Sequence, residues 1–146
     1  MKPMTGKTVL ITGGTGGIGK AAAVGLASMG ARVGITGRDQ AALDAAVRSI
    51  GRDVEAFRSD ISKVADLEAL RAHIEEQYGR VDVVFANAGT AKPGPFERVT
   101  EDDFDFGVDT NLKGSFFTVQ KLVPLMTAGG TVVLNTSIQG SKGWPG

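Results

Sequence analysis

The fold is decided by one stretch near the N-terminus, Thr8-Val9-Leu10-Ile11-Thr12-Gly13-Gly14-Thr15-Gly16-Gly17-Ile18-Gly19. Its first five residues carry no charge and are mostly β-branched, which is typical of a strand buried on both faces of a sheet. A glycine-rich turn follows, and the alanine-rich residues 20–29 predict a helix. Glycine permits positive φ and close backbone approach, and a helix N-terminus offers free N–H groups to an anion. The stretch therefore predicts a phosphate-binding turn between a strand and a helix, in preference to a turn without a ligand.

The rest of the chain repeats this alternation of strand and helix. Apolar, β-branched runs predict four further strands, at residues 32–36, 54–57, 81–85 and 131–134. Periodic apolar positions predict three further helices, at residues 40–50, 63–78 and 101–126. Right-handed crossovers between such strands give an α/β fold, a doubly wound parallel sheet of about five strands with helices on both faces. Ligands bind such sheets at the carboxyl ends of the strands, near the point where the strand order reverses.

Capping residues set the expected ends of two helices. Asp39 is placed to cap the helix at residues 40–50, and Gly51 is placed to end it. Thr100 and Asp103 form the capping-box pattern at the start of the last helix. These local signals predict where both helices begin.

The last helix, at residues 101–126, is the least regular of the four. Gly107 and Gly114 weaken it and leave two shorter helices as an alternative, and Pro124 should end or bend its last turn. Its apolar residues recur every four positions, at Phe104, Val108, Leu112 and Phe116. We expect three of its phenylalanines, Phe104, Phe116 and Phe117, to lie in a core or an interface.

Length, charge and composition exclude several classes of protein. The 146 residues are the length of one ordinary domain, so we expect residues 1–146 to form a single domain. The 16 basic and 16 acidic residues give no net charge, which argues against a nucleic-acid binder or an anionic membrane partner. No apolar run could span a bilayer, and the N-terminus lacks the apolar core of a secretory signal. With no cysteine, disulfides and cysteine zinc sites are excluded, and no metal site is predicted. A cytoplasmic location is the expectation.

The glycine loop alone leaves two phosphate ligands open. The run from Gly14 to Lys20 matches most of a nucleoside triphosphate P-loop, but Ala21 stands where that motif needs a hydroxyl for Mg²⁺. Glycines 13, 17 and 19 follow instead the spacing G-x-x-x-G-x-G, which is not the standard dinucleotide pattern G-x-G-x-x-G, although glycines 14, 16 and 19 do fit that pattern. Residues further along the chain must therefore decide between a nucleotide hydrolase and a dinucleotide-binding protein.

Motifs from residue 12 to residue 137 favour the dinucleotide. The loop Thr12-Gly13-x-x-x-Gly17-Ile18-Gly19 is followed by an acid after the third strand, by Asn-Ala-Gly after the fourth, by an asparagine on the long helix and by a serine after the fifth. In this order they resemble the classical short-chain dehydrogenase/reductase family. The resemblance implies a Rossmann fold and hydride transfer between NAD(P)(H) and a small carbonyl or alcohol substrate. It also implies a homo-oligomer.

The resemblance also implies a role for each motif residue. The loop residues would hold the cofactor pyrophosphate, and they are Gly13, Thr15, Gly17, Ile18 and Gly19. Asp60 would lie near the adenine, and the nicotinamide ribose would pass Asn87, Ala88 and Gly89. The catalytic residues present in the chain would be Ser137, which would hydrogen-bond the substrate oxygen, and Asn111, at a kink in the long helix. Trp144 and Pro145 would lie in a loop that borders the substrate.

The end of the second strand indicates which nicotinamide cofactor is bound. NAD-binding proteins place an acid there to bind the ribose hydroxyls, but by the resemblance this position is Gly37. Arg38 follows and is suited to the 2′-phosphate of NADP(H), because its planar fork matches a phosphate group. Asp39 comes next and has the alternative role of capping a helix. The sequence therefore favours NADP(H) over NAD(H).

One part of the family's machinery does not occur in these 146 residues. The chemistry needs the pattern Tyr-x-x-x-Lys after the serine, with the tyrosine as general acid or base. Tyr78 is the only tyrosine, and Asp82 lies four residues after it. We therefore expect a truncated reductase that is inactive by itself. A non-catalytic nucleotide-binding or interaction module is the alternative.

Overall fold

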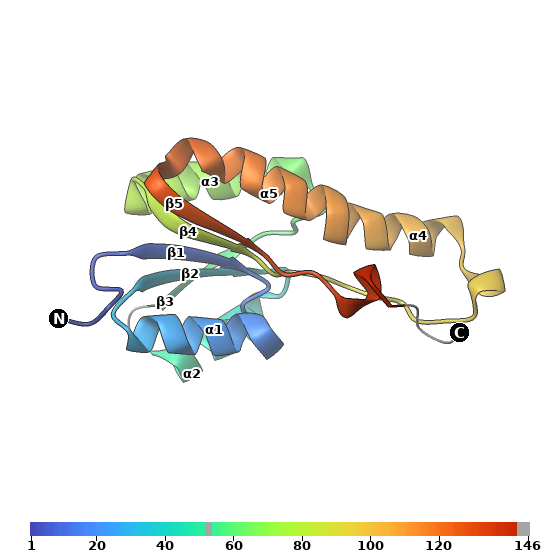
Figure 1. The fold of residues 1–146 in the computed structure, drawn as a ribbon, viewed down its shortest axis with the longest axis horizontal. Coiled ribbons are helices and arrows are strands. Elements are labelled where there is room, and N and C mark those ends of the chain that lie inside the picture. The colour runs from blue at the N-terminus through green and yellow to red at the C-terminus, as the bar shows by residue number, and fades with distance from the viewer. Residues whose placement is uncertain (52–53, 143–146) are drawn as a thin grey trace.

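The computed structural model describes residues 1–51 and 54–142 (Figure 1). Within this part of the chain, five parallel strands form one sheet in the order β3-β2-β1-β4-β5. The strands are β1 (Thr8–Thr12), β2 (Arg32–Gly37), β3 (Val54–Arg58), β4 (Val81–Ala86) and β5 (Met126–Leu134). The predicted doubly wound α/β sheet is confirmed, and the order of the strands reverses between β1 and β4.

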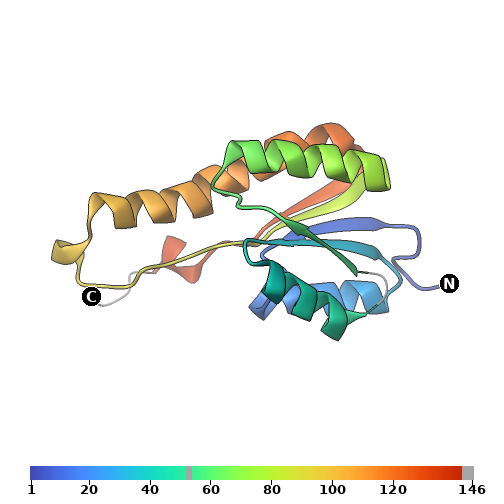
Figure 2. The same ribbon diagram turned by 180° about the vertical axis from the view of Figure 1, so that it is seen from behind.

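Helices cover both faces of the sheet. The helices are α1 (Gly17–Ser28), α2 (Gln40–Ile50), α3 (Val64–Tyr78), α4 (Glu101–Val108) and α5 (Ser115–Leu122). Figures 1 and 2 show α1 and α2 on one face, and α3 and α5 on the other. None of the helices in the described part of the chain is both long and apolar enough to cross a bilayer.

The position of β1 in the sheet explains why this strand carries no charged residue. Successive side chains of a strand point to opposite faces of a sheet. Val9 and Ile11 accordingly pack in the apolar core beneath α1 and α2, while Leu10 packs in the second core, beneath α3 and α5. All three are fully buried, so these positions must be apolar, while the buried Thr8 and Thr12 at the ends of the strand are polar but uncharged.

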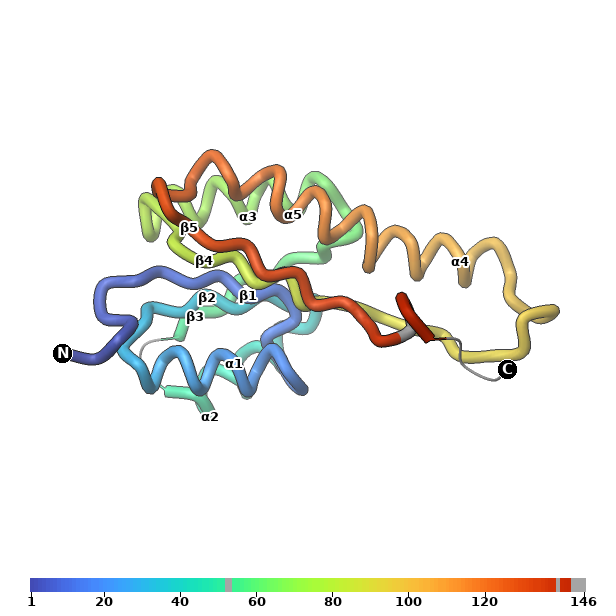
Figure 3. The backbone as a smooth tube through the Cα atoms, viewed as in Figure 1, coloured from blue at the N-terminus to red at the C-terminus, as the bar shows by residue number. Residues whose placement is uncertain are grey.

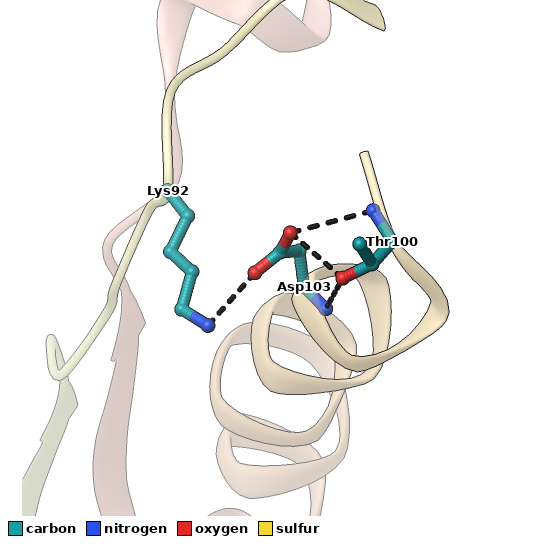
Figure 4. A network of polar contacts seen from close by, with 3 residues as sticks. All are labelled: Lys92, Thr100 and Asp103. Carbon is teal, nitrogen blue, oxygen red and sulfur yellow. Dashed lines mark hydrogen bonds and ion pairs between the residues drawn. The ribbon is translucent and has the colours of Figure 1, made fainter. Parts of the chain in front are cut away.

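The capping predictions are confirmed. Asp39 Oδ1 accepts a hydrogen bond of 2.7 Å from the backbone N–H of Ala42, and Gly51 ends α2 with a φ of 124°. The capping box is present at α4, where the side chain of Thr100 accepts from the N–H of Asp103 and the Asp103 carboxylate accepts from the N–H of Thr100 (Figure 4). Both helices therefore begin where short-range hydrogen bonding sets them.

The single helix expected at residues 101–126 is broken. A π-helical segment, Asp109–Gly114, separates α4 from α5, and a short 3-10 turn, Val123–Leu125, contains Pro124 and ends the helical region. A Cβ at Gly114 would lie 2.9 Å from the carbonyl oxygen of Ile61, so this glycine allows the helix to approach the segment before α3. The alternative of two helices is thus closer to the structure, and the prediction that Pro124 ends or bends the last turn is confirmed, because the helical region ends there.

Strand β5 begins earlier than expected. It was predicted at residues 131–134 but extends from Met126, which pairs with Val81. The register then shifts, and regular pairing resumes where Thr131 faces Val83. Gly129 lies in the irregular part with a φ of 83°, a conformation that other residues rarely adopt. The apolar pattern therefore located only the regular half of the strand.

The apolar stripe on the last helices does not form part of the core of this chain. Phe104, Leu112 and Phe116 are 63%, 68% and 61% exposed, whereas Phe117 packs against the core beneath α3. For Phe104, Figures 1 and 3 show the reason, because its helix α4 extends past the sheet, alongside the segments that follow β4 and β5. A core position for Phe104 and Phe116 was therefore wrong, and an interface remains a prediction.

Candidate functional site

A cleft of about 360 Å³ lies at the carboxyl ends of the strands, where the order of the sheet reverses. Its walls come from the glycine loop, from the ends of β2, β3 and β4, and from the π-helical segment. Seven of the residues expected to bind cofactor line it, namely Gly13, Thr15, Arg38, Asp60, Asn87, Ala88 and Gly89. Residues as distant in sequence as Gly13 and Thr110 therefore meet at one place.

Glycine is needed at several positions of the loop, and the structural reason differs from one position to the next. Gly13 has a φ of 69° and Gly17 a φ of 52°, conformations that disfavour any side chain. A Cβ at Gly14 would lie 2.5 Å from the side chain of Ile35 on β2. A Cβ at Gly19 would meet the carbonyl oxygen of Gly13 directly. The loop therefore packs against β2 at Gly14 and against its own backbone at Gly19, where a side chain would have no room.

Thr12 and Asn87 hold this loop to β4. The Thr12 hydroxyl oxygen accepts hydrogen bonds of 3.0 Å from the backbone N–H groups of Asn87 and Ala88. In return, Asn87 Nδ2 donates to the carbonyl oxygens of Thr12, at 3.0 Å, and Gly13, at 3.2 Å. Sequence reasoning singled out Asn87 for the ribose and gave Thr12 no role of its own. The signal for Thr12 was its place as the last residue of a buried strand.

The end of β2 presents a cation to the cleft. A Cβ at Gly37 would lie 2.8 Å from Thr15 Cγ2, so a larger residue would crowd the glycine loop. Arg38 is exposed, its carbonyl oxygen accepts a hydrogen bond from Arg58, and its guanidinium carbon lies 5.9 Å from the ring centre of Phe106 on α4. Within the described residues Arg38 makes no ion pair. Its charge is therefore available to an anion.

Asp60 shapes the turn between β3 and α3. Its Oδ1 accepts from the backbone N–H of Ser62 at 3.1 Å and from the Ser62 hydroxyl at 2.8 Å. Its own N–H donates to Asp66 Oδ2 at 2.9 Å. Asp60 thus lies in the cleft as expected, but one carboxylate oxygen is used by the protein, and a contact with adenine stays a prediction.

Asn111 lies in the π-helical segment and holds the loop that follows β4. Its Oδ1 accepts from the N–H of Thr90 and its Nδ2 donates to the carbonyl oxygen of Thr90, both at 2.8 Å. A single-turn π-helix inside an α-helix is often found at functional sites. The helical irregularity expected at Asn111 is present, and the side chain uses both ends of its amide within the protein.

Ser137 follows β5 at the same edge of the sheet. Its carbonyl oxygen accepts from the N–H of Gly140 at 3.1 Å, in the short 3-10 turn Ile138–Gly140. Trp144 and Pro145, expected to border a substrate, lie outside the described residues. Asn135 was not selected from the sequence, yet its Nδ2 donates to Asn87 Oδ1 at 2.9 Å. The end of β5 is therefore connected directly to the glycine-loop network.

The loop after β4 carries a second charged group near the cleft (Figure 4). Lys92 Nζ lies 2.8 Å from Asp103 Oδ1 and 4.8 Å from the ring centre of Phe106. The hydrogen bond from Lys92, followed by those from Thr100, lowers the pKa of Asp103 to about 2. Lys92 therefore faces a carboxylate, while Arg38, near the same ring, does not.

The sequence of this chain is similar to those of known proteins. The family model described as short chain dehydrogenase matches residues 7–146. Oxidoreductase asL5 of Sarocladium schorii is 41% identical over 144 residues, which cover 97% of this chain and 58% of that protein. The chain thus spans little more than half the length of this relative.

Two solved structures hold different cofactors. A 3-ketoacyl-(acyl-carrier-protein) reductase from Brucella melitensis complexed with NADH is 37% identical, with a TM-score of 0.78 over 83% of this chain and 50% of that chain. The RhlG/NADP active-site complex of Pseudomonas aeruginosa is 32% identical, with a TM-score of 0.79 over 83% of this chain and 48% of that chain. These similarities alone do not select one nicotinamide cofactor.

Proposed function

The chain belongs to the short-chain dehydrogenase family, and from this membership we propose that it forms the cofactor-binding part of an NADP(H)-dependent oxidoreductase. Residues 1–146 form one dinucleotide-binding domain of the Rossmann type in this proposal. The complete enzyme transfers a hydride between NADP(H) and the carbonyl or alcohol carbon of a small-molecule substrate. We place it in the cytoplasm, as a homo-oligomer.

The end of β2 carries the choice of NADP(H). Gly37 has no side chain that could bind ribose hydroxyls, and the room for one is taken by Thr15. Arg38, on the rim of the cleft, supplies a cation whose planar donors match a phosphate group. Asp39 already uses one carboxylate oxygen to cap α2. This arrangement supports a 2′-phosphate in preference to the free hydroxyls of NAD(H).

The glycine loop supports a site for the pyrophosphate. Helix α1 begins at Gly17 without a side chain that caps its N-terminus, so its first N–H groups remain available to an anion. The close approach of Gly19 to Gly13 leaves only backbone on that surface. In the proposal Thr15 and Ile18 flank the pyrophosphate, Thr15 from the cleft and Ile18 from the exposed side of α1.

The remaining residues have roles on the adenosine and substrate sides. Asp60 lies beside the adenine, while Asn87, Ala88 and Gly89 lie along the nicotinamide ribose. The bound dinucleotide supplies or accepts the hydride. Ser137 donates a hydrogen bond to the substrate oxygen and so orients and polarises the carbonyl group. Because Asn111 is bonded to Thr90, we assign it the role of positioning the loop beside the cofactor.

We further propose that these 146 residues do not catalyse reduction by themselves. The only tyrosine, Tyr78, lies at the opposite end of the sheet, where its hydroxyl donates to Glu55 Oε2 at 3.1 Å. Burial, followed by the charge of Glu55, raises the pKa of Tyr78 above its usual value. A phenol that is held protonated and distant from the cleft cannot serve as the general acid or base there.

Cofactor titration of the purified chain tests the proposal. We expect NADPH to bind at least about tenfold more tightly than NADH, because a charge-assisted hydrogen bond contributes about 1.5–3 kcal/mol. Replacing Arg38→Leu should abolish this preference by weakening NADPH alone. Calorimetric titration of both cofactors gives both affinities.

A matched control is Arg48→Leu, which removes an exposed arginine from α2 and should change neither affinity. Equal wild-type affinities for NADPH and NADH would contradict the choice of cofactor. Binding of neither would contradict the dinucleotide site itself.

A further inference from the structure

A chain of side-chain hydrogen bonds runs from the end of β5 to the glycine loop. Asn135 Nδ2 donates to Asn87 Oδ1 at 2.9 Å, and Asn87 Nδ2 donates to the carbonyl oxygens of Thr12 and Gly13. Asn135 is anchored in turn, because its backbone N–H donates to the carbonyl oxygen of Ala86 at 3.0 Å. Three segments of the sheet edge are therefore connected through one amide.

The orientation of that amide follows from its partners. An amide nitrogen only donates hydrogen bonds and a carbonyl oxygen only accepts them. The end of Asn87 that faces the two carbonyl oxygens must therefore be its NH₂ group, and its oxygen must face Asn135. That oxygen needs a donor, which the NH₂ group of Asn135 supplies. A residue at position 135 that only accepts hydrogen bonds would favour the reversed amide.

We propose that Asn135 is a positioning residue, which fixes the amide of Asn87 and thereby holds the glycine loop in the form that binds the dinucleotide. This inference rests on the proposed cofactor site. If the amide of Asn87 turned by 180°, its oxygen would face the carbonyl oxygens of Thr12 and Gly13 and repel them. The loss of these two hydrogen bonds would loosen the loop at the point where Gly19 lies directly against Gly13 and Asn87.

The same bonds connect the cofactor loop with the segment that carries Ser137, two residues after Asn135. Energetic coupling between two places is reciprocal. If Asn135 holds the loop, then cofactor bound to the loop must stabilise the end of β5. We therefore expect NADPH to slow hydrogen exchange at the backbone N–H of Asn135.

Two variants at position 135 and a control at position 136 should differ in NADPH affinity in a predictable order. Asn135→Leu removes the donor and should weaken NADPH binding about three- to tenfold. Asn135→Asp offers only acceptors, attracts the NH₂ group of Asn87 and should weaken binding by roughly 10- to 50-fold, because hydrogen bonds to charged groups are stronger. Thr136→Ala changes the next residue, which takes no part in these bonds, and should remain within about twofold of wild type.

Hydrogen exchange of the Gly13–Gly19 amides without cofactor supplies a readout that does not need binding. Faster exchange in the Asp variant than in the Leu variant, in protein that remains folded by circular dichroism, supports the proposal. Unchanged exchange and unchanged NADPH affinity in both variants would overturn it, as would an Asp variant no worse than Leu. Should wild-type chain bind no dinucleotide, the proposed function fails, and loop exchange alone then decides whether Asn135 positions Asn87.

Discussion

Strands β2 and β5 carry similar apolar, β-branched residues, but the side chains of β2 are covered by helices and those of β5 are largely exposed. Val33 and Ile35 of β2 are 0% exposed beneath α1 and α2, whereas Val133 and Leu134 of β5 are 43% and 57% exposed. In the described sheet β2 lies between two neighbours, and β5 pairs with β4 alone. An apolar, β-branched run therefore identifies a strand, but the elements around it decide whether its side chains are covered.

The candidate site includes residues from both the covered and the exposed region of the molecule. The proposed cofactor side is built from glycine and backbone in the covered half of the molecule, which comprises β1, β2 and β3 with α1 and α2, and close packing there leaves the loop little freedom. The proposed substrate side depends on Asn111 and Ser137 in the exposed half of the molecule, which comprises α4, α5 and β5 with the segments that join and follow them. We therefore expect the cofactor cradle to be rigid before any ligand binds, and the substrate side to depend more on what packs against β5 and α5.

The largest effect should follow from filling the glycine loop. In Gly19→Ala the added methyl group would meet the carbonyl oxygen of Gly13 and the amide of Asn87. Overpacking of this kind costs about 1–3 kcal/mol in stability, and we expect NADPH affinity to fall at least roughly 30-fold. Gly25→Ala on α1 is the control, since a Cβ there meets nothing within 4 Å. Urea unfolding and NADPH titration of both variants measure the effects, and unaltered binding by Gly19→Ala would show that the loop yields easily.

A loss of stability without a direct loss of cofactor affinity should follow from removing the buried acid that joins the two halves. Asp82 of β4 is 5% exposed and accepts hydrogen bonds from the N–H of Thr8, the ammonium group of Lys7 and the hydroxyl of Thr127. Asp82→Ala leaves these donors without their acceptor and should lower the free energy of unfolding by about 3 kcal/mol. The control Asp44→Ala removes an exposed acid from α2 and should change stability little.

Asp82 also predicts how stability depends on pH. The hydrogen bond from Thr8, and then the interactions with Lys7, hold the pKa of Asp82 below its usual value of 3.8. The unfolded chain therefore binds a proton at a higher pH than the folded chain, so this carboxylate stabilises the fold above that value and less as the pH falls below it. Unfolding measured from pH 6 to pH 2 should show a weaker pH dependence in Asp82→Asn than in wild type. Parallel curves would contradict this role.

The smallest effect on the fold, but a clear one on association, should follow from changes in the exposed half. Phe116 is mostly exposed on α5 and lines an apolar groove beside Val132 and Leu134. We expect wild-type chain to associate with rising concentration and Phe116→Lys to associate at least about tenfold more weakly, because a charge disfavours burial. Val24→Lys changes a comparable exposed residue on α1 and should leave association unchanged. Light scattering over a concentration series measures the association of all three proteins. A wild-type chain that stays monomeric at every concentration would contradict the prediction.

Local signals accounted for much of the fold. The strand at residues 8–12 and the helix at residues 40–50 have the predicted bounds, because an uncharged, β-branched run and the cap at Asp39 are local features of the sequence. The last helix was less predictable. Its π-helical segment allows Gly114 to pack against Ile61, a contact between distant residues that no helical periodicity contains.

The sequence by itself determined the order of strands and helices, the place of the glycine loop, and which residues would gather near it. Those features follow from apolar periodicity, glycine conformation and motif order, all of which are written along the chain. Only the tertiary structure decided what Asn87 does, because its partners Thr12 and Asn135 lie 75 and 48 residues away. A hydrogen bond needs a donor and an acceptor at a particular distance and angle, and the packed sheet alone supplies that geometry.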